Sequence, residues 1–141
     1  MSFKILVPSY QKQLLRPSFA TSVSAGFPSP ADDFIDKQLD LNDHLIYNKE
    51  ATFYVKVSGD SMINAGIYDG DLLIVDKSLT PKNNSIVIAI VNNEFTVKRL
   101  KLNNGSAALM PENPKYQPIE FNESSELSIW GVVTNVIRSC L

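Results

Sequence analysis

The chain has 141 residues, of which 44% are hydrophobic and 20% charged, a composition typical of one soluble globular domain. Its net charge of −2 at pH 7 argues against the basic surface that direct nucleic-acid binding requires, so little direct DNA binding is expected. One histidine and one cysteine cannot supply a His/Cys zinc site, and neither a metal nor another cofactor is predicted.

The amino-terminal region, residues 1 to about 50, is interrupted by prolines and has little sustained hydrophobic periodicity. We interpret residues 1–50 as an extended arm and linker, with one short helical turn within residues 30–41 that Ser29 is able to cap. Its first residues turn polar too early for a signal peptide, and no apolar run approaches the about 20 residues of a membrane span. A single cysteine also fits a reducing compartment, so we expect a cytoplasmic protein.

From residue 51 onward, short β segments alternate with turn residues. In the first segment, residues 51–57, Phe53, Val55 and Val57 alternate with polar neighbours, the period of a half-buried strand. Several short strands at this spacing predict a mostly β domain over residues 51–141. The other expected features are a turn at Asp69–Gly70, strands at 85–91, 94–100 and 126–137, a turn at Asn104–Gly105, a loop at 111–118 and a bulge at Gly131.

The dipeptide Asn92–Asn93 predicts how two of these strands pair. A two-residue hairpin loop there places Val87 opposite Lys98 on one face of the sheet. Aliphatic neighbours penalise the charged form of a lysine and lower its pKa, and a neutral amine is a competent general base. The same pattern also fits a lysine that buries its stem and keeps its ammonium group in water.

The strand at 51–57 leads directly into Ser58-Gly59-Asp60-Ser61-Met62. Gly59 permits a sharp turn, and Asp60 or Ser61 is able to cap a short helical turn that continues to about Asn64 and stops near Gly66. The backbone N–H groups at such a turn can stabilise an oxyanion, and we take those of Asp60 and Ser61 as candidate donors. Ordinary capping chemistry explains the same residues equally well.

The sequence offers few other bases for a hydrolase. His44 is the only histidine for a Ser-His-Asp triad, and a Cys-His pair would need His44 together with Cys140. Neither residue lies in a recognisable motif. We therefore expect a hydrolase built on this chain to find its base elsewhere.

Three segments together resemble the LexA/UmuD family of serine–lysine autopeptidases. YVKVSGDSMINAGIYDGDLLIVDKS is similar to the family's nucleophile region, EFTVKRL to its lysine segment and GFPSPADDF to its cleavage region. The resemblance covers about residues 24–138 and implies a compact β-rich peptidase domain, often found as a homodimer. It further implies that Ser61 is the nucleophile, that Lys98 is the general base, and that the chain cuts itself between Ala25 and Gly26.

The resemblance also implies a biological role. The 25 residues before the bond are too few for the helix-turn-helix domain of a LexA-type repressor, so the UmuD role is expected. In that role, RecA filaments on single-stranded DNA stimulate cleavage during the SOS response, and the trimmed form supports a UmuC-like Y-family translesion DNA polymerase. Two alternatives stay open: a non-catalytic interaction module of the same fold, and a signal-peptidase-like enzyme acting on other proteins.

Overall fold

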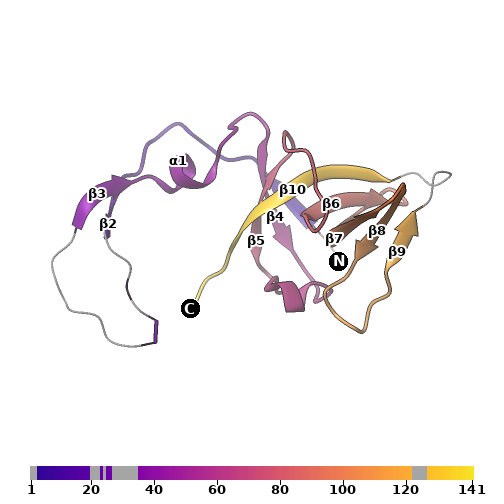
Figure 1. Ribbon diagram of the computed structural model, residues 1–141. Coiled ribbons are helices and arrows are strands. Elements are labelled where there is room, and N and C mark those ends of the chain that lie inside the picture. The colour runs from indigo at the N-terminus through magenta and orange to yellow at the C-terminus, as the bar shows by residue number, and fades with distance from the viewer. Residues whose placement is uncertain (1–2, 20–22, 24, 27–34, 122–126) are drawn as a thin grey trace. The chain divides into compact units, whose positions relative to one another are not determined.

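The computed structural model of the protein describes residues 3–19, 23, 25–26, 35–121 and 127–141 (Figure 1). The chain divides into two compact units, one formed by residues 1–8 with 48–141 and the other by residues 9–47. Strands dominate the described backbone, which confirms the predicted mostly β fold. No helix in these described ranges is long and apolar enough to cross a membrane.

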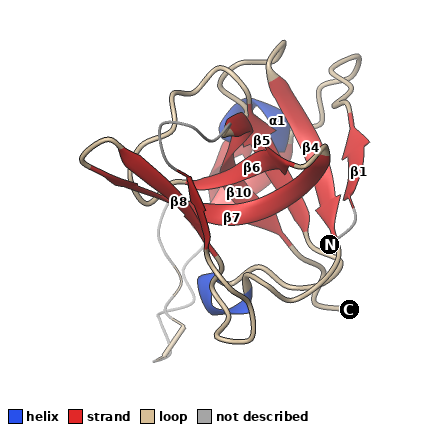
Figure 2. Ribbon diagram, turned by 90° about the vertical axis from the view of Figure 1, so that its right-hand side faces the viewer, coloured by secondary structure: helices blue, strands red, loops and turns tan. Residues whose placement is uncertain are grey.

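The larger unit is built on one antiparallel sheet of eight strands, in the order β1-β4-β5-β10-β6-β7-β8-β9. Figure 2 shows that this sheet is strongly curved rather than flat. A single 3₁₀ turn, η1 (Ile63–Ala65), lies between β4 and β5 in the chain. The strands are β1 (Phe3–Leu6), β4 (Thr52–Val57), β5 (Leu72–Asp76), β6 (Ile86–Val91), β7 (Glu94–Asn103), β8 (Ser106–Met110), β9 (Ile119–Phe121) and β10 (Ser128–Ile137).

The β6–β7 hairpin has the predicted register. Asn92 and Asn93 have φ angles of 50° and 64°, the left-handed conformation that a two-residue hairpin turn requires. Val87 consequently pairs with Lys98, as predicted. The turn expected at Asn104–Gly105 likewise joins β7 to β8, and residues 111–118 form a loop.

The central strand β10 contains the bulge predicted at Gly131. Its pairing with β6 shifts register between Ile129 and Gly131. A Cβ atom on Gly131 would lie 2.6 Å from Cγ1 of Val75 on β5, which is too close for any side chain. The glycine therefore permits close contact between β10 and β5 at the point where the strand bends.

Buried apolar side chains form two clusters on opposite faces of the sheet. On β6, for example, Ile88 packs in the first cluster, whereas Val87 and Ala89 pack in the second. Leu100 of β7 also belongs to the second cluster, so Lys98, two positions earlier, lies on that same apolar face. The alternation along these strands thus places the lysine on a sheet face that carries aliphatic side chains.

The smaller unit differs from the helical turn predicted within residues 30–41. Residues 35–39 form a strand, β3 (Ile35–Leu39), which pairs with β2 (Arg16–Phe19), so the prediction is wrong for this part. Only Asp40 separates β3 from the helix α1 (Leu41–Leu45), which begins there because the Asp40 carboxylate accepts hydrogen bonds from the N–H groups of residues 42 and 43. Residues 29–34, which include the expected cap Ser29, lie outside the described residues.

The first residues of the chain also differ from the extended arm that the sequence suggested. Strand β1 is an edge strand of the large sheet and pairs with β4 from Phe3↔Val57 to Leu6↔Tyr54. Four residues are too short a run to show a period of two, and Pro8, close behind, resembles a linker signal. The pairing depends on a strand about 50 residues away, which local pattern cannot reveal.

Candidate active site

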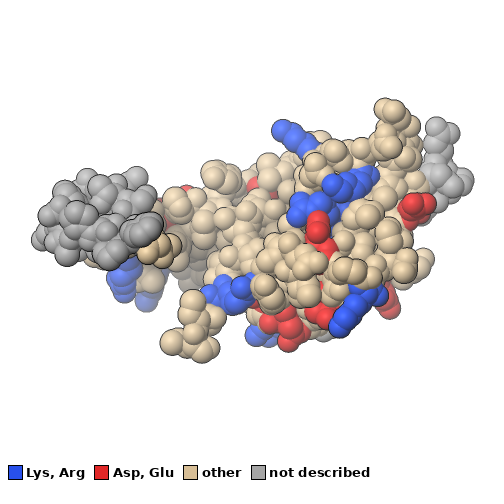
Figure 3. Space-filling model, turned by 60° about the horizontal axis from the view of Figure 1, so that its bottom comes forward, with Lys and Arg blue, Asp and Glu red and all other residues tan. Residues whose placement is uncertain are grey.

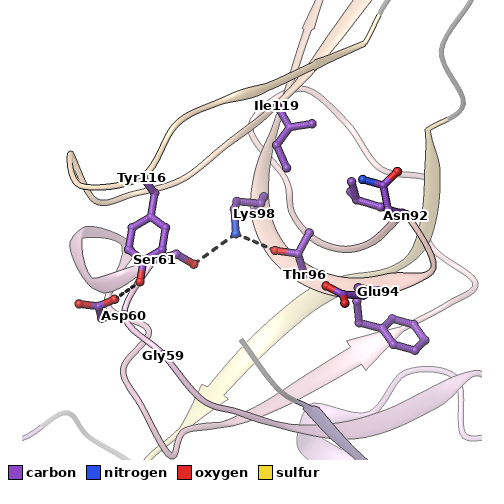
Figure 4. Close-up of a pocket in the computed structure, with 11 residues that line it drawn as sticks. Gly59, Asp60, Ser61, Asn92, Glu94, Thr96, Lys98, Tyr116 and Ile119 are labelled. Carbon is purple, nitrogen blue, oxygen red and sulfur yellow. Dashed lines mark hydrogen bonds between the residues drawn. The ribbon is translucent and has the colours of Figure 1, made fainter.

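Ser61 and Lys98 lie together at a cavity of about 260 Å³ in the larger unit (Figure 4). Both are buried, with 3% and 7% of their surfaces exposed. Ser61 comes from the segment between β4 and η1, and Lys98 from the middle of β7. The cavity is lined by Gly59, Asp60, Ser61, Val91, Asn92, Glu94, Phe95, Thr96, Lys98, Tyr116 and Ile119.

The Lys98 amine has three hydrogen-bond partners. Its Nζ atom donates to Oγ of Ser61 at 3.2 Å and to Oγ1 of Thr96 at 2.6 Å. It also donates to the carbonyl oxygen of Val97 at 3.0 Å. Three acceptors match the three N–H donors of a charged ammonium group.

Burial lowers the pKa of Lys98, because the protein interior solvates the ammonium form poorly. A neutral amine keeps two N–H donors and gains one lone pair. With Thr96 and the Val97 carbonyl accepting the two remaining hydrogens, the lone pair faces the Ser61 hydroxyl. The arrangement can therefore remove a proton from Ser61.

The segment that carries Ser61, residues 58–66, is here called the serine turn. Its helical part is shorter than predicted: η1 begins at Ile63, its cap residue is Met62, and no side chain caps it. The prediction that Asp60 or Ser61 caps the turn is wrong, because the Asp60 carboxylate accepts from the Tyr116 hydroxyl and the Ser61 hydroxyl faces Lys98. Gly66, with φ of 80°, ends the turn as expected.

The backbone around Ser61 is held through its carbonyl groups. The carbonyl oxygen of Asp60 accepts from Nδ2 of Asn113 at 2.8 Å, and that of Ser61 accepts from the Glu112 N–H at 2.8 Å. Within the described parts of the chain, no hydrogen bond has the N–H group of Asp60 or Ser61 as its donor. These N–H groups are therefore available for an external acceptor beside the serine hydroxyl.

Sequence reasoning did not single out Thr96, Asn113 or Tyr116. Thr96 had a usable signal, because it lies two positions before Lys98 on the same strand face. Asn113 and Tyr116 had no such sequence signal, since they lie in a proline-rich loop more than 50 positions from Asp60, to which both donate hydrogen bonds.

The other candidate residues are not among those that line the cavity. Ala25 and Gly26 are exposed and lie in a bend of the smaller unit, so a bond between them is open to solvent. His44 is exposed in α1, and Cys140 is an exposed free thiol near the carboxyl end. Of the sequence-predicted residues, the structure brings together Ser61, Lys98 and Asp60.

The surface charge of the larger unit is mixed on the face drawn in Figure 3. Lysine and arginine side chains lie interspersed with aspartate and glutamate there. Two of the ion pairs in the described residues join Arg99 to Glu112 and Arg138 to Asp71. No extended patch of one sign marks this face.

Comparison with known protein families and sequences gives consistent matches over most of the chain. The family model described as Peptidase S24-like matches residues 17–134. Protein ImpA of Salmonella typhimurium is 44% identical over 133 residues, which cover 93% of this chain and 89% of ImpA. Protein SamA of Salmonella typhimurium is 48% identical over 126 residues, 89% of this chain and 87% of SamA. The LexA repressor of Alcanivorax borkumensis is 40% identical over 116 residues, 82% of this chain but only 56% of the repressor.

Proposed function

The chain belongs to the peptidase S24-like family, and from that premise we propose that it is a serine endopeptidase that cuts its own Ala25–Gly26 bond. The single observation that carries this proposal is the buried contact of 3.2 Å between Lys98 Nζ and Ser61 Oγ. A serine hydroxyl is a weak nucleophile unless a base takes its proton, and a lysine of lowered pKa is such a base.

The reaction proceeds through an acyl-enzyme. Neutral Lys98 takes the Ser61 hydroxyl proton while Oγ forms a bond to the carbonyl carbon of Ala25. The tetrahedral intermediate collapses, the C–N bond breaks, and the Lys98 ammonium returns the proton to the amino group of Gly26. Lys98 then takes a proton from a water molecule, whose oxygen attacks the carbonyl carbon of the Ser61 ester. The bond from this carbon to Oγ breaks, the Lys98 ammonium returns the proton to Oγ of Ser61, and the new carboxylic acid of Ala25 loses its proton to solvent.

The negative charge of the tetrahedral intermediate needs donors near Ser61. We assign this role to the backbone N–H groups of Asp60 and Ser61, which carry no other hydrogen bond among the described residues. Thr96 and the Val97 carbonyl hold the amine of Lys98 in the orientation that aims its lone pair at Ser61. No metal or cofactor has a part in this scheme.

The relatives support a role in SOS mutagenesis. The match spans 89% of ImpA and 87% of SamA. By this likeness, RecA filaments on single-stranded DNA stimulate the cleavage. The trimmed homodimer then supports a UmuC-like Y-family polymerase in error-prone translesion synthesis.

Intact-mass measurement during incubation tests the proposal. Wild-type protein, incubated at neutral and alkaline pH and with RecA filaments, is expected to yield residues 26–141. Ser61→Ala and Lys98→Ala are expected to remain intact, because one removes the nucleophile and the other the base.

Exposed residues supply the matched controls. His44→Ala and Cys140→Ser should cleave like wild type, since both side chains are exposed and absent from the cavity lining. Cleavage that persists in Ser61→Ala would rule out the mechanism. An intact wild type under all conditions would favour a non-catalytic interaction module of the same fold.

A further inference from the structure

The loop between β8 and β9, residues 111–118, forms hydrogen bonds with the serine turn and with strand β7, which carries Lys98. Its Glu112 exchanges two backbone hydrogen bonds with the serine turn: its N–H donates to the Ser61 carbonyl at 2.8 Å, and its carbonyl accepts from the Asn64 N–H at 2.9 Å. The Glu112 carboxylate accepts from Nε of Arg99 at 2.6 Å, and Arg99 directly follows Lys98 on β7. This loop therefore connects the segments that carry the nucleophile and the base.

Asn113 of the same loop binds the peptide unit next to the nucleophile. Its Nδ2 donates to the Asp60 carbonyl at 2.8 Å. The Asp60 carbonyl and the Ser61 N–H belong to one planar peptide group, in which C=O and N–H point in opposite directions. A hydrogen bond that fixes this carbonyl therefore also fixes the direction of the Ser61 N–H.

We propose that Asn113 is a positioning residue that aims the Ser61 N–H at the oxyanion of the cleavage reaction. This inference rests on the proposed peptidase function, because an oxyanion forms only if Ser61 attacks a carbonyl. Asn113 acts through the backbone and not by touching the substrate, since it is absent from the cavity lining.

The side chain of Asn113 is itself held in place. It is 5% exposed, and its Oδ1 accepts from the Lys115 N–H at 3.0 Å. This second bond distinguishes the two ends of the amide group, because the oxygen faces residue 115 and the nitrogen faces Asp60. A fixed donor of this kind restrains the peptide group without reorganising during the reaction.

Tyr116 restrains Asp60 as well, through its side chain. Its hydroxyl donates to the Asp60 carboxylate (Figure 4), and Tyr116 N–H donates to the Asn113 carbonyl at 3.1 Å. Asp60 is therefore held by its backbone through Asn113 and by its side chain through Tyr116. Restraint at both ends keeps the peptide group between Asp60 and Ser61 from rotating.

The test compares full-length Asn113→Asp and Asn113→Ala with wild type across the pH range of cleavage. Asn113→Asp retains the acceptor for Lys115 and removes the donor to Asp60, whereas Asn113→Ala removes both without adding charge. We expect the limiting rate at high pH to fall about 10- to 100-fold in each variant, a part of the loss seen when an oxyanion donor is removed. The midpoint of the rate–pH curve should stay at its wild-type value in Asn113→Ala, because this change adds no charge near Lys98.

Two further variants keep the test decisive. Asn103→Asp adds the same charge on the β7–β8 hairpin and should cleave like wild type. Tyr116→Phe, a change at a partly exposed side chain, should lower the limiting rate several-fold even if the Asn113 variants fail to fold. Rates are compared well below each variant's unfolding temperature, so that reduced stability alone does not lower them.

The outcomes separate this inference from the proposed function. If wild type cleaves but the folded Asn113 variants reach the same limiting rate, or if only the midpoint moves, the positioning role is overturned. With unfolded Asn113 variants, an unchanged rate in Tyr116→Phe overturns it. If wild type itself stays intact, the proposed function fails and the positioning role fails with it.

Discussion

The chemistry proposed for Lys98 depends on a buried amine that loses its proton more easily than an exposed one. Burial lowers the pKa of Lys98, so its neutral form is populated at a lower pH than for an ordinary lysine. We expect the cleavage rate to rise with pH through this lowered pKa and to level off above it, because only neutral Lys98 accepts the Ser61 proton. A rate–pH curve from intact mass, with Lys98→Ala flat at the background rate, checks this prediction.

A midpoint at about 10.4, the value of an exposed lysine, would contradict the role of burial. A falling rate at high pH would instead indicate that the charged form is required. Ser61→Ala run in parallel distinguishes dyad cleavage from alkaline hydrolysis, which has no preferred bond.

At the scale of single residues, the strand pairing that positions Lys98 is predictable from the sequence, but the hydrogen bonds that hold the backbone beside Ser61 are not. Asn92–Asn93 determines the β6–β7 register, and the register alone places Lys98 on an apolar face. The contact between Ser61 and Lys98 came from family resemblance, since the two segments lie in different parts of the sheet. Asn113 was not predictable, because side chain-to-backbone bonds between distant loops leave no periodic signal.

Among the elements, the shape of strand β10 depends on one glycine, Gly131. A Cβ atom at Gly131 would lie 2.6 Å from Cγ1 of Val75, a buried and branched side chain that has little room to move. We expect Gly131→Ala to lower the free energy of unfolding by about 1–3 kcal/mol, the usual cost of overpacking a core. Urea denaturation measures the change.

Val75→Ala provides the matched background for this prediction. Removing Cγ1 of Val75 leaves space that the new methyl group can occupy, so Gly131→Ala should cost less in that background. Equal costs in both backgrounds would mean that the steric contact does not control the bulge.

Elements with local turn signals were predicted well, and elements that depend on distant partners were not. The β6–β7 and β7–β8 hairpins are marked by asparagine and glycine residues that accept positive φ. The roughly helical spacing of the apolar residues in and before β3 predicts a helical turn, but pairing with β2 overrides that preference. Strand β1 has no local sequence signal either, because it depends on pairing with β4, which lies about 50 residues later in the chain.

For the whole molecule, the proposed cleavage has a consequence for the large sheet. The fragment that ends at Ala25 contains β1, whose pairing with β4 covers one edge of the sheet. This pairing is short, and it places Lys4 directly opposite Lys56, a like-charge pair that weakens it. Ile5 and Leu6 also remain about 40% and 38% exposed, so β1 buries little apolar surface.

We therefore expect β1 to leave when the chain is cut, which would uncover the edge of β4 just before the serine turn. Hydrogen–deuterium exchange of residues 52–57 should be faster in the 26–141 product than in full-length Ser61→Ala. Lys4→Glu, introduced into Ser61→Ala, should slow this exchange, because it replaces a repulsive pair by an attractive one. Equal exchange in the cut and uncut proteins would show that β1 does not protect β4. Once β1 has left, the free edge of β4 is able to pair with an extended segment of another chain. Cleavage of one bond would then change which partners the domain can bind.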